Sequence, residues 1–240
     1  MPHEYENIIP RFVRTMHLPI EPNASRNDLV AKPSVLKLIF ENKNVNIEEK
    51  IDGANCGMTI INDHPVIRNR NHILSKAQSG RSRTPAKLQF AAIWNWFYSN
   101  AKKFEKLASE LGFMPSIYGE WLYAIHSVEY DLLPDFFVAY DIYDYRRKIF
   151  LNPLTARSLL EKAGFSLPHK LTNPKVNTED SLRLMRDGHS IFSSVSQREG
   201  IYIKTYDEDQ ILDRFKMVRK DFITDDHWNK KELRKNRKAK

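Results

Sequence analysis

The sequence predicts a single α+β domain rich in antiparallel sheet. Runs of β-forming residues occur early, in the middle and late in the chain, and they do not alternate regularly with helices as a doubly wound parallel sheet requires. The 240 residues contain no repeat, low-complexity stretch or linker, and a chain of this length can be served by one hydrophobic core. These observations favour one domain in which helices flank antiparallel sheets.

The first half of the chain predicts a β-hairpin preceded by a short helix. Ser34 is expected to cap that helix. A turn is expected at residues 62–65, because asparagine, aspartate and proline cluster between two apolar runs. Strands are predicted at residues 47–51, 55–61 and 66–70, and a polar basic loop at residues 71–83.

The second half predicts one long helix and two further groups of strands. Thr84 and Pro85 are typical of a helix start, and apolar residues at helical spacing continue to Gly112. The run at 136–143 is continuously apolar, which is typical of a central strand covered on both faces. The remaining predictions are strands at residues 116–123, 200–204 and 211–218 and capped helices at residues 155–164 and 178–188.

Composition excludes several classes of protein. No apolar run approaches the roughly 20 residues of a membrane-spanning helix, and residues 1–7 are polar and acidic, unlike a secretory signal. The single cysteine, Cys56, excludes an intramolecular disulfide and argues against a structural zinc site. We therefore expect a cytoplasmic, reducing setting and no membrane contact.

The charge is basic and unevenly distributed. Lysine and arginine number 38 against 30 acidic residues, a net charge of +8, which suits a polyanionic partner and equally suits simple solubility. Basic residues crowd the last stretch of the chain. We therefore divide the chain into a domain at residues 1–222 and a basic tail at residues 223–240.

An ordered set of short motifs carries the chemistry. The first, Glu49-Lys50-Ile51-Asp52-Gly53, places a lysine between acids at the end of a predicted strand. Alone it is a weak signal, because three fixed positions recur by chance. The later members are Arg70, Gly119-Glu120, Tyr140-Asp141, the run from Glu199 to Lys204, and Lys216.

This set resembles the covalent nucleotidyltransferase superfamily of polynucleotide ligases and mRNA capping enzymes. The match spans residues 50–216, and the spacing of Asn55 and Arg70 from Lys50 is most similar to RNA ligases of the phage double-strand-repair branch. Residues 14–19 and 119–131 look similar to compact RNA-repair ligases. The resemblance implies a single nucleotidyltransferase domain, ATP-grasp-like. Many relatives append an OB domain after the last motif, and the expectation of no OB domain here departs from that pattern.

The residue types also indicate a divalent metal. A lysine is nucleophilic only when neutral, and nearby cations lower its pKa whereas carboxylates raise it. Carboxylates beside Lys50 therefore imply a magnesium or manganese ion between them. Asp52, Glu120 and Glu199 supply the hard oxygen ligands that such an ion prefers.

The resemblance implies a reaction and a role for each motif residue. Lys50 attacks the α-phosphorus of ATP, and AMP then passes through the lysyl adduct to an RNA 5′-phosphate that a 3′-hydroxyl seals. Lys204 and Lys216 are expected to hold the α-phosphate, while Tyr140 stacks on adenine and Ile201 or Ile203 covers its other face. The predicted catalytic residues are Lys50, Lys204 and Lys216, and the predicted nucleotide-binding residues are Glu49, Lys50, Asn55, Arg70, Glu120, Tyr140, Glu199, Ile201, Lys204 and Lys216.

Some alternatives stay open in the sequence. Tyr140 lies in an apolar run, so packing is as good an interpretation as base stacking. The family's last motif carries two lysines separated by one residue, so either Arg219 replaces the second cation after Lys216 or the register differs. The same lysyl chemistry would suit a DNA ligase or a capping guanylyltransferase, and a non-catalytic RNA-binding remnant is a third hypothesis.

The expected partner is RNA with 5′-phosphate and 3′-hydroxyl ends, and the protein is expected to be a monomer. The basic tail and the loop at 71–83 are expected to contact the strand, because a broken strand presents phosphates on both sides of the break. An end-processing kinase or phosphatase is a further candidate partner.

Overall fold

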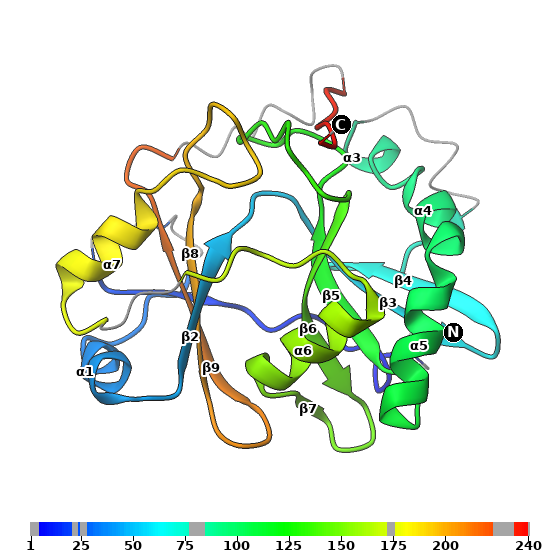
Figure 1. The fold of residues 1–240 in the computed structure, drawn as a ribbon, viewed down its shortest axis with the longest axis horizontal. Coiled ribbons are helices and arrows are strands. Elements are labelled where there is room, and N and C mark those ends of the chain that lie inside the picture. Colours follow the sequence, from blue (N-terminus) through cyan, green and yellow to red (C-terminus); the bar gives the residue numbers. More distant parts are fainter. Residues whose placement is uncertain are drawn as a thin grey trace.

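Two twisted sheets face each other in the computed structural model and carry their helices on the outer sides (Figure 1). The structure describes residues 5–20, 24, 28–76, 85–171, 176–222 and 233–239. The predicted α+β class with antiparallel-rich sheets is confirmed. None of the helices in these ranges has the length and apolarity that crossing a bilayer requires.

The first sheet has the strand order β1-β9-β8-β2. Its strands are β1 (Met16–His17), β2 (Val45–Lys50), β8 (Gly200–Tyr206) and β9 (Ile211–Val218). Helices α1 (Ser34–Glu41) and α7 (Glu179–Arg186) lie beside it in Figure 1. Apolar side chains of these elements, including Ile39, Ile47, Leu182, Ile201 and Ile203, form one core cluster. Alternate residues of β2 and β8 therefore point away from this core, toward the second sheet.

The second sheet has the order β4-β3-β5-β6-β7. Its strands are β3 (Ala54–Ile61), β4 (His64–Asn69), β5 (Ser116–Trp121), β6 (Phe137–Asp144) and β7 (Ile149–Phe150). The predicted hairpin turn lies between β3 and β4, where Asn62 and Asp63 have φ of 50° and 62°. Asparagine and aspartate tolerate this left-handed region better than most residues, which fits a tight hairpin turn.

The predicted long helix is broken into shorter ones. The structure has α3 (Pro85–Leu88), α4 (Ile93–Ser99) and α5 (Ala101–Leu111), and Thr84 lies outside the described residues. At the second break, Asn100 has φ −116° and ψ 9°, and its side-chain Nδ2 donates to the carbonyl of Trp96 at 2.8 Å. Asparagine side chains compete with the helical hydrogen-bond ladder in this way, which the apolar periodicity does not reveal.

Helix α6 (Pro153–Ala163) and α5 pack on the second sheet, and both end as the sequence predicts. Gly112 and Gly164 take the left-handed conformation after α5 and α6. The start of α6 differs from the prediction, because Asn152 caps it and Pro153 occupies its first turn. Ser34 begins α1 without a side-chain cap, whereas Thr178 caps α7 through a capping box.

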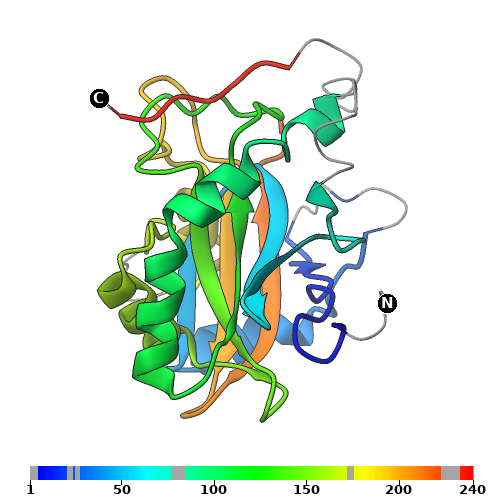
Figure 2. The same ribbon diagram turned by 90° about the vertical axis from the view of Figure 1, so that its right-hand side faces the viewer.

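The predicted basic tail is partly visible. Residues 223–232 and Lys240 lie outside the described residues, as do residues 77–83 of the predicted basic loop. Residues 233–239 extend along the top of the molecule in Figure 2 and bridge to Ala124 and Leu133 in the connection between β5 and β6. This part of the tail therefore packs against the folded domain.

Candidate active site

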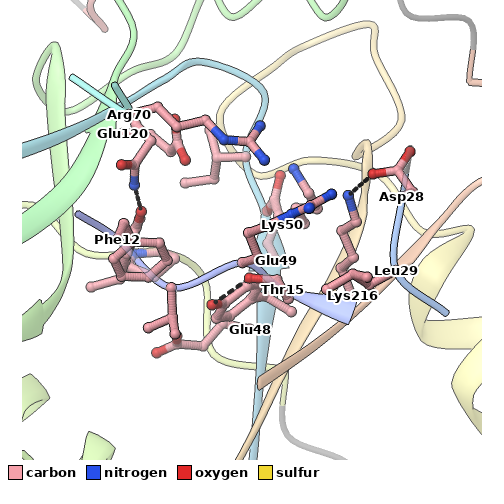
Figure 3. Close-up of a pocket in the computed structure, with 17 residues that line it drawn as sticks. Phe12, Thr15, Asp28, Leu29, Glu48, Glu49, Lys50, Arg70, Glu120 and Lys216 are labelled. Atoms are coloured by element: carbon pink, nitrogen blue, oxygen red, sulfur yellow. Dashed lines mark hydrogen bonds and ion pairs between the residues drawn. The ribbon is translucent and has the colours of Figure 1, made fainter. Parts of the chain in front are cut away.

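The cavity between the two sheets brings most of the predicted motif residues together (Figure 3). Strands β2, β8 and β9 supply its residues from one sheet, and β3, β5 and β6 supply those from the other. The predicted residues that line it are Glu49, Lys50, Asn55, Arg70, Glu120, Tyr140 and Lys216. Sequence positions from 49 to 216 thus meet at one concave surface.

Lys50 is the last residue of β2, and its side chain forms an ion pair with a carboxylate. Its Nζ lies 2.6 Å from Oε2 of Glu199, which immediately precedes β8. Burial alone would lower the pKa of Lys50, but the carboxylates of Glu199 and Glu120 outweigh it, and the pKa lies above its usual value. In this arrangement Lys50 is an ammonium and cannot act as a nucleophile.

Two acids flank the lysine: Glu199 is buried, and Glu120 is half-buried. Burial raises the pKa of Glu120 to about 8 and that of Glu199 to about 7, although Lys50 opposes both shifts. Among the described residues, Oε2 of Glu120 is a buried oxygen with no hydrogen-bond partner. A buried carboxylate oxygen in this state is free to receive a cation.

The carboxylate of Asp52 is held by backbone N–H groups. Its Oδ2 accepts hydrogen bonds from the backbone N–H groups of Ser127 and Val128 at 2.7 and 2.9 Å. Within the described ranges, no three histidine, cysteine, aspartate or glutamate side chains are clustered closely enough to form a metal site by themselves. The predicted metal ligands therefore lie around Lys50 without forming a closed protein-only shell.

The glycine of the first motif is required by a close approach of two backbones. A Cβ atom at Gly53 would lie 3.0 Å from the carbonyl oxygen of Trp121 and closer still to Leu122. Since β3 pairs with β5 immediately afterwards, with Asn55 opposite Glu120, this approach brings the first motif beside the glutamate of β5.

Aromatic side chains form one wall of the cavity. Tyr140 on β6 receives a hydrogen bond from Nδ2 of Asn55 at 2.5 Å, and its ring lies 6.2 Å from that of Tyr202. Ile201 was predicted to cover the base, but it is 0% exposed and lies with Ile203 in the core on the opposite face of β8. Because side chains alternate along a strand, Tyr202 faces the cavity instead.

The two predicted phosphate-binding lysines have different surroundings. Lys216 lines the cavity, and its Nζ lies 3.3 Å from Oδ1 of Asp28. Lys204 was predicted beside it, but its side chain is fully buried behind Tyr140, with Nζ 2.9 Å from Glu48 and 2.8 Å from Asp141. Lys204 therefore does not reach the cavity surface in this structure, which differs from its predicted place.

The last motif is explained by strand alternation. Arg214 precedes Lys216 by two residues on β9 and points to the same side, where its Nη2 lies 3.1 Å from Asp141. Arg219 lies beyond the strand, and its guanidinium pairs with Gln197 and Asp221. Arg214 is therefore the cation next to Lys216 on this side of β9, and neither Arg214 nor Arg219 lines the cavity that contains Lys216.

Glu49 contributes to the cavity wall from the strand that carries Lys50. Its carboxyl group is buried, which raises its pKa, while Ser190 and Arg198 oppose the shift. The side chain therefore lies in a different polar environment from the acids around Lys50.

The N-terminal segment contributes residues that sequence reasoning did not assign to the site. Phe12, Arg14 and Thr15 line the cavity, and the Thr15 hydroxyl lies 3.2 Å from that of Tyr202. The segment is held there because β1 pairs in parallel with β9, aligning His17 with Lys216. The signal in the sequence that could have identified this segment is the run of residues 14–19. It resembles compact RNA-repair ligases, but no role in the site is assigned to it from the sequence.

Comparison with solved structures identifies the fold. The chain is similar to a Naegleria gruberi RNA ligase variant solved with ATP and Mn, at 22% identity and a TM-score of 0.57, covering 76% of this chain and 52% of that one. The same ligase with PPi matches at 23% identity and 0.57, covering 82% and 56%. A variant with AMP and Mn matches at 20% and 0.53, covering 77% and 53%. The chain thus spans about half the length of these structures.

The family follows from the sequence model. A model described as RNA ligase matches residues 43–218, which is more than half of the chain. Comparison with curated proteins gives no match. The protein therefore belongs to the RNA ligase family, and the resemblance found in its motifs is confirmed.

Proposed function

We propose that this chain is an ATP-dependent RNA ligase that works through a lysyl-AMP intermediate on Lys50. The observation that carries the proposal is the position of Lys50: its amine lies at the wall of a cavity that also presents Arg70, Lys216 and Tyr140. Phosphoryl transfer needs mainly positioning and neutralisation of charge, and this cavity offers a nucleophile, cations and an aromatic wall together.

The first step joins Lys50 to AMP. The ammonium loses its proton, Nζ forms a bond to the α-phosphorus of ATP, and the bond from that phosphorus to the bridging oxygen breaks, so that pyrophosphate leaves. In the second step an oxygen of the RNA 5′-phosphate attacks the same phosphorus and breaks the P–N bond. A 3′-hydroxyl then attacks the 5′-phosphate, releases AMP and loses its proton as the phosphodiester forms.

The cavity wall supports specific contacts with the nucleotide. The Tyr140 ring, oriented by Asn55, and the Tyr202 ring provide aromatic faces for adenine. Lys216 and Arg70 lie where they can approach phosphate and ribose oxygens. The pKa of Lys216 is lowered by burial and by Lys50, and an arriving phosphate would offset that repulsion.

The acids around Lys50 fit a divalent cation such as Mg²⁺ or Mn²⁺. Glu120 has an unpartnered buried oxygen, and the pKa values of Glu120 and Glu199 are raised by burial and, to a smaller extent, by the neighbouring carboxylates. Glu120 and Glu199 would hold the ion directly, and Asp52 through water. When bound, such an ion supplies positive charge that lowers the pKa of Lys50 and neutralises phosphate oxygens.

One test with labelled nucleotides distinguishes the proposed reaction with ATP from the same lysyl chemistry with GTP. Purified protein is incubated with labelled ATP or GTP and Mg²⁺, and covalent adducts are separated on a denaturing gel. We expect an AMP adduct that Lys50→Ala abolishes and that the exposed-surface variant Lys37→Ala retains. An adduct that persists in Lys50→Ala overturns the assignment, and preferential GMP transfer indicates a capping guanylyltransferase.

The absence of any adduct would favour a non-catalytic RNA-binding remnant. The acids beside Lys50 argue against this reading, because uncompensated carboxylates beside a phosphate site cost free energy that a remnant has no reason to retain.

The substrate class is proposed from the branch that the motifs resemble. Asn55 and Arg70, whose spacing is similar to the phage double-strand-repair branch, lie at the same cavity, which supports that branch. We propose that the substrate is RNA with 5′-phosphate and 3′-hydroxyl ends and that the protein acts as a cytoplasmic monomer. Sealing assays on nicked RNA, nicked DNA and broken hairpin loops distinguish an RNA ligase from a DNA ligase.

A further inference from the structure

Residues 233–239, here called the C-terminal clasp, pair with both limbs of the loop between β5 and β6. The N–H of Ile125 donates to the carbonyl of Arg234, and the N–H of Arg237 donates to that of Tyr130, each at 2.9 Å. The N–H of Ala239 donates to the carbonyl of Leu133, also at 2.9 Å. The clasp is therefore bonded through its backbone along its length (Figure 2).

Asn236 joins the two limbs of that loop from the inside. It is 3% exposed, and its Oδ1 accepts a hydrogen bond from the N–H of Tyr130 at 2.8 Å. Its Nδ2 donates to the carbonyls of Leu122 at 2.9 Å and Ala124 at 3.1 Å. Both donor hydrogens and the acceptor of the amide are thus satisfied. Only glutamine carries the same amide group, and its side chain is longer by one methylene.

The same loop holds Asp52, two residues after the proposed nucleophile. The backbone N–H of Asp52 donates to the hydroxyl of Tyr130 at 2.8 Å, and Tyr130 is fully buried. The carboxylate of Asp52 in turn accepts from the N–H groups of Ser127 and Val128. Two hydrogen bonds, one to the backbone and one to the hydroxyl of Tyr130, therefore link Asn236 to Asp52 through that residue.

The basic side chains of the clasp face acids of the protein itself. Nη2 of Arg234 lies 2.8 Å from Glu129, and Nζ of Lys238 lies 3.1 Å from Asp135. The Arg234–Glu129 pair is exposed and adds little stability, whereas Asp135 is a buried partner of Lys238. Both pairs engage basic groups that the sequence assigned to RNA. The buried amide, rather than the charges, is the distinctive feature of the clasp.

We propose that the C-terminal clasp is a positioning element for the active site, in which Asn236 and Tyr130 act as positioning residues that orient Asp52 and the backbone leaving Lys50. This inference rests on the proposed function for its activity readout only. It replaces the expectation that this part of the tail serves mainly to grip RNA.

The test compares Asn236→Ala with a matched buried asparagine. Asn152 is 8% exposed, caps α6 through Oδ1 and donates from Nδ2 to the carbonyl of Asp207. It follows β7, which lies at the opposite end of the molecule from the C-terminus in Figure 1. Asn152→Ala therefore removes a similar number of buried hydrogen bonds away from the site. Tyr130→Phe is the second variant and removes only the hydroxyl that receives the Asp52 N–H.

The first readout is the single-turnover rate of lysyl-AMP formation. At saturating ATP we expect Asn236→Ala to be slower than wild type by about tenfold to a hundredfold, since a small misplacement of reacting groups has this effect. Tyr130→Phe shifts the rate in the same direction, the half-saturating ATP concentration stays within about threefold, and Asn152→Ala stays within about twofold of wild type. Equal slowing in Asn236→Ala and Asn152→Ala would overturn the proposal, because it would reflect general destabilisation.

The second readout needs no activity. Native-state hydrogen exchange is followed at the amides of Asp52, Ser127 and Val128, with amides of β6 as an internal reference. Asn236→Ala is expected to speed exchange at these three amides by about tenfold or more while β6 is unchanged, as in a local opening. Unchanged protection, or weaker RNA binding with a normal adduct rate, overturns the inference. A wild-type protein that forms no adduct disproves the proposed function, and the exchange result still decides the role of the clasp.

Discussion

Nζ of Lys50 and Oε2 of Glu199 form a direct ion pair at 2.6 Å, although 149 positions separate the two residues in the sequence. This carboxylate keeps the lysine protonated, which is the unreactive form of the proposed nucleophile. In the proposed reaction the pair therefore corresponds to a resting state, in which Glu199 would exchange the ammonium for another cation before Lys50 attacks.

Replacing Glu199 by glutamine is expected to lower the pKa of Lys50. The substitution removes the neighbouring negative charge that most stabilises the ammonium, while burial continues to favour the neutral amine. The pKa is measured by the pH dependence of Lys50 labelling with an amine-specific reagent, read by mass spectrometry. We expect a lower pKa of Lys50 than in wild type, and no change in Glu110→Gln on the exposed face of α5. An increase would contradict the assigned ion pair.

Binding of a divalent cation is expected to weaken as the pH falls from 8.5 to 6.5. The pKa values of about 8 for Glu120 and about 7 for Glu199 mean that protons compete with the ion in this range. Mn²⁺ titrations followed by electron paramagnetic resonance at several pH values measure the effect. Glu120→Gln should bind Mn²⁺ more weakly and with a shallower pH dependence, whereas affinity independent of pH would exclude these carboxylates as ligands.

The half-buried Glu120 is also expected to lower stability at alkaline pH. Its folded-state pKa lies above the ordinary value of 4.5, so between about pH 4.5 and 8 the folded protein binds more protons than the unfolded chain. Its contribution is therefore favourable at low pH and is lost as the pH rises through 8. Urea unfolding should show Glu120→Gln to be more stable than wild type by about 2 kcal/mol at pH 8.5, with little difference at pH 5. A variant that is less stable at pH 8.5 would contradict this.

Replacing Lys204 by methionine is expected to reduce mainly stability, whereas replacing Lys216 is expected to abolish mainly adduct formation. Lys204→Met leaves the buried carboxylates of Glu48 and Asp141 without their shared cation and should destabilise folding by about 3–5 kcal/mol. Lys216→Met breaks a partly exposed pair with Asp28 and should cost about 1 kcal/mol or less, while formation of the adduct is lost. Equilibrium unfolding together with adduct formation separates the two, and a fully stable Lys204→Met variant would show that the buried network is not structural.

The aromatic wall is expected to determine affinity for ATP. Tyr140→Ala and Tyr202→Ala should each weaken ATP binding by about 1–3 kcal/mol, the range found for stacking of a base on an aromatic ring. Tyr202→Phe keeps the ring and loses only the contact with Thr15, so it should bind ATP nearly as wild type does. Calorimetric titration with a non-hydrolysable ATP analogue measures the difference. Wild-type affinity in both alanine variants would support packing as the role of these rings.

Local patterns predicted the strands well, because apolar runs and turn residues act over short distances. The hairpin at residues 54–69 and the late pair β8 and β9 lie where the sequence places them. Ile201 shows why matching a motif by sequence alone can assign the wrong side chain to a site. Side chains alternate along β8, so Ile201 lies in the core and Tyr202 faces the cavity. Applying that alternation to the motif would have identified the tyrosine.

Contacts between distant segments could not be predicted in the same way. The N-terminal segment reaches the cavity through a two-residue parallel pairing with β9, too short to leave a periodic signal. The role of Asn236 is equally hidden, because a single asparagine in a basic stretch shows neither its burial nor its partners. Both features depend on tertiary contacts with residues distant in the sequence, which the local sequence around each of them does not reveal.

The pairing of β2 with β8 has a kinetic consequence. It aligns residues 45–50 with residues 200–205, so closing the site requires ordering the whole intervening chain, a costly loop closure that slows folding. During refolding from denaturant, helical circular dichroism should therefore return before the capacity to bind ATP. The site is assembled by the most non-local contacts of the fold and should be the last part of the molecule to become competent.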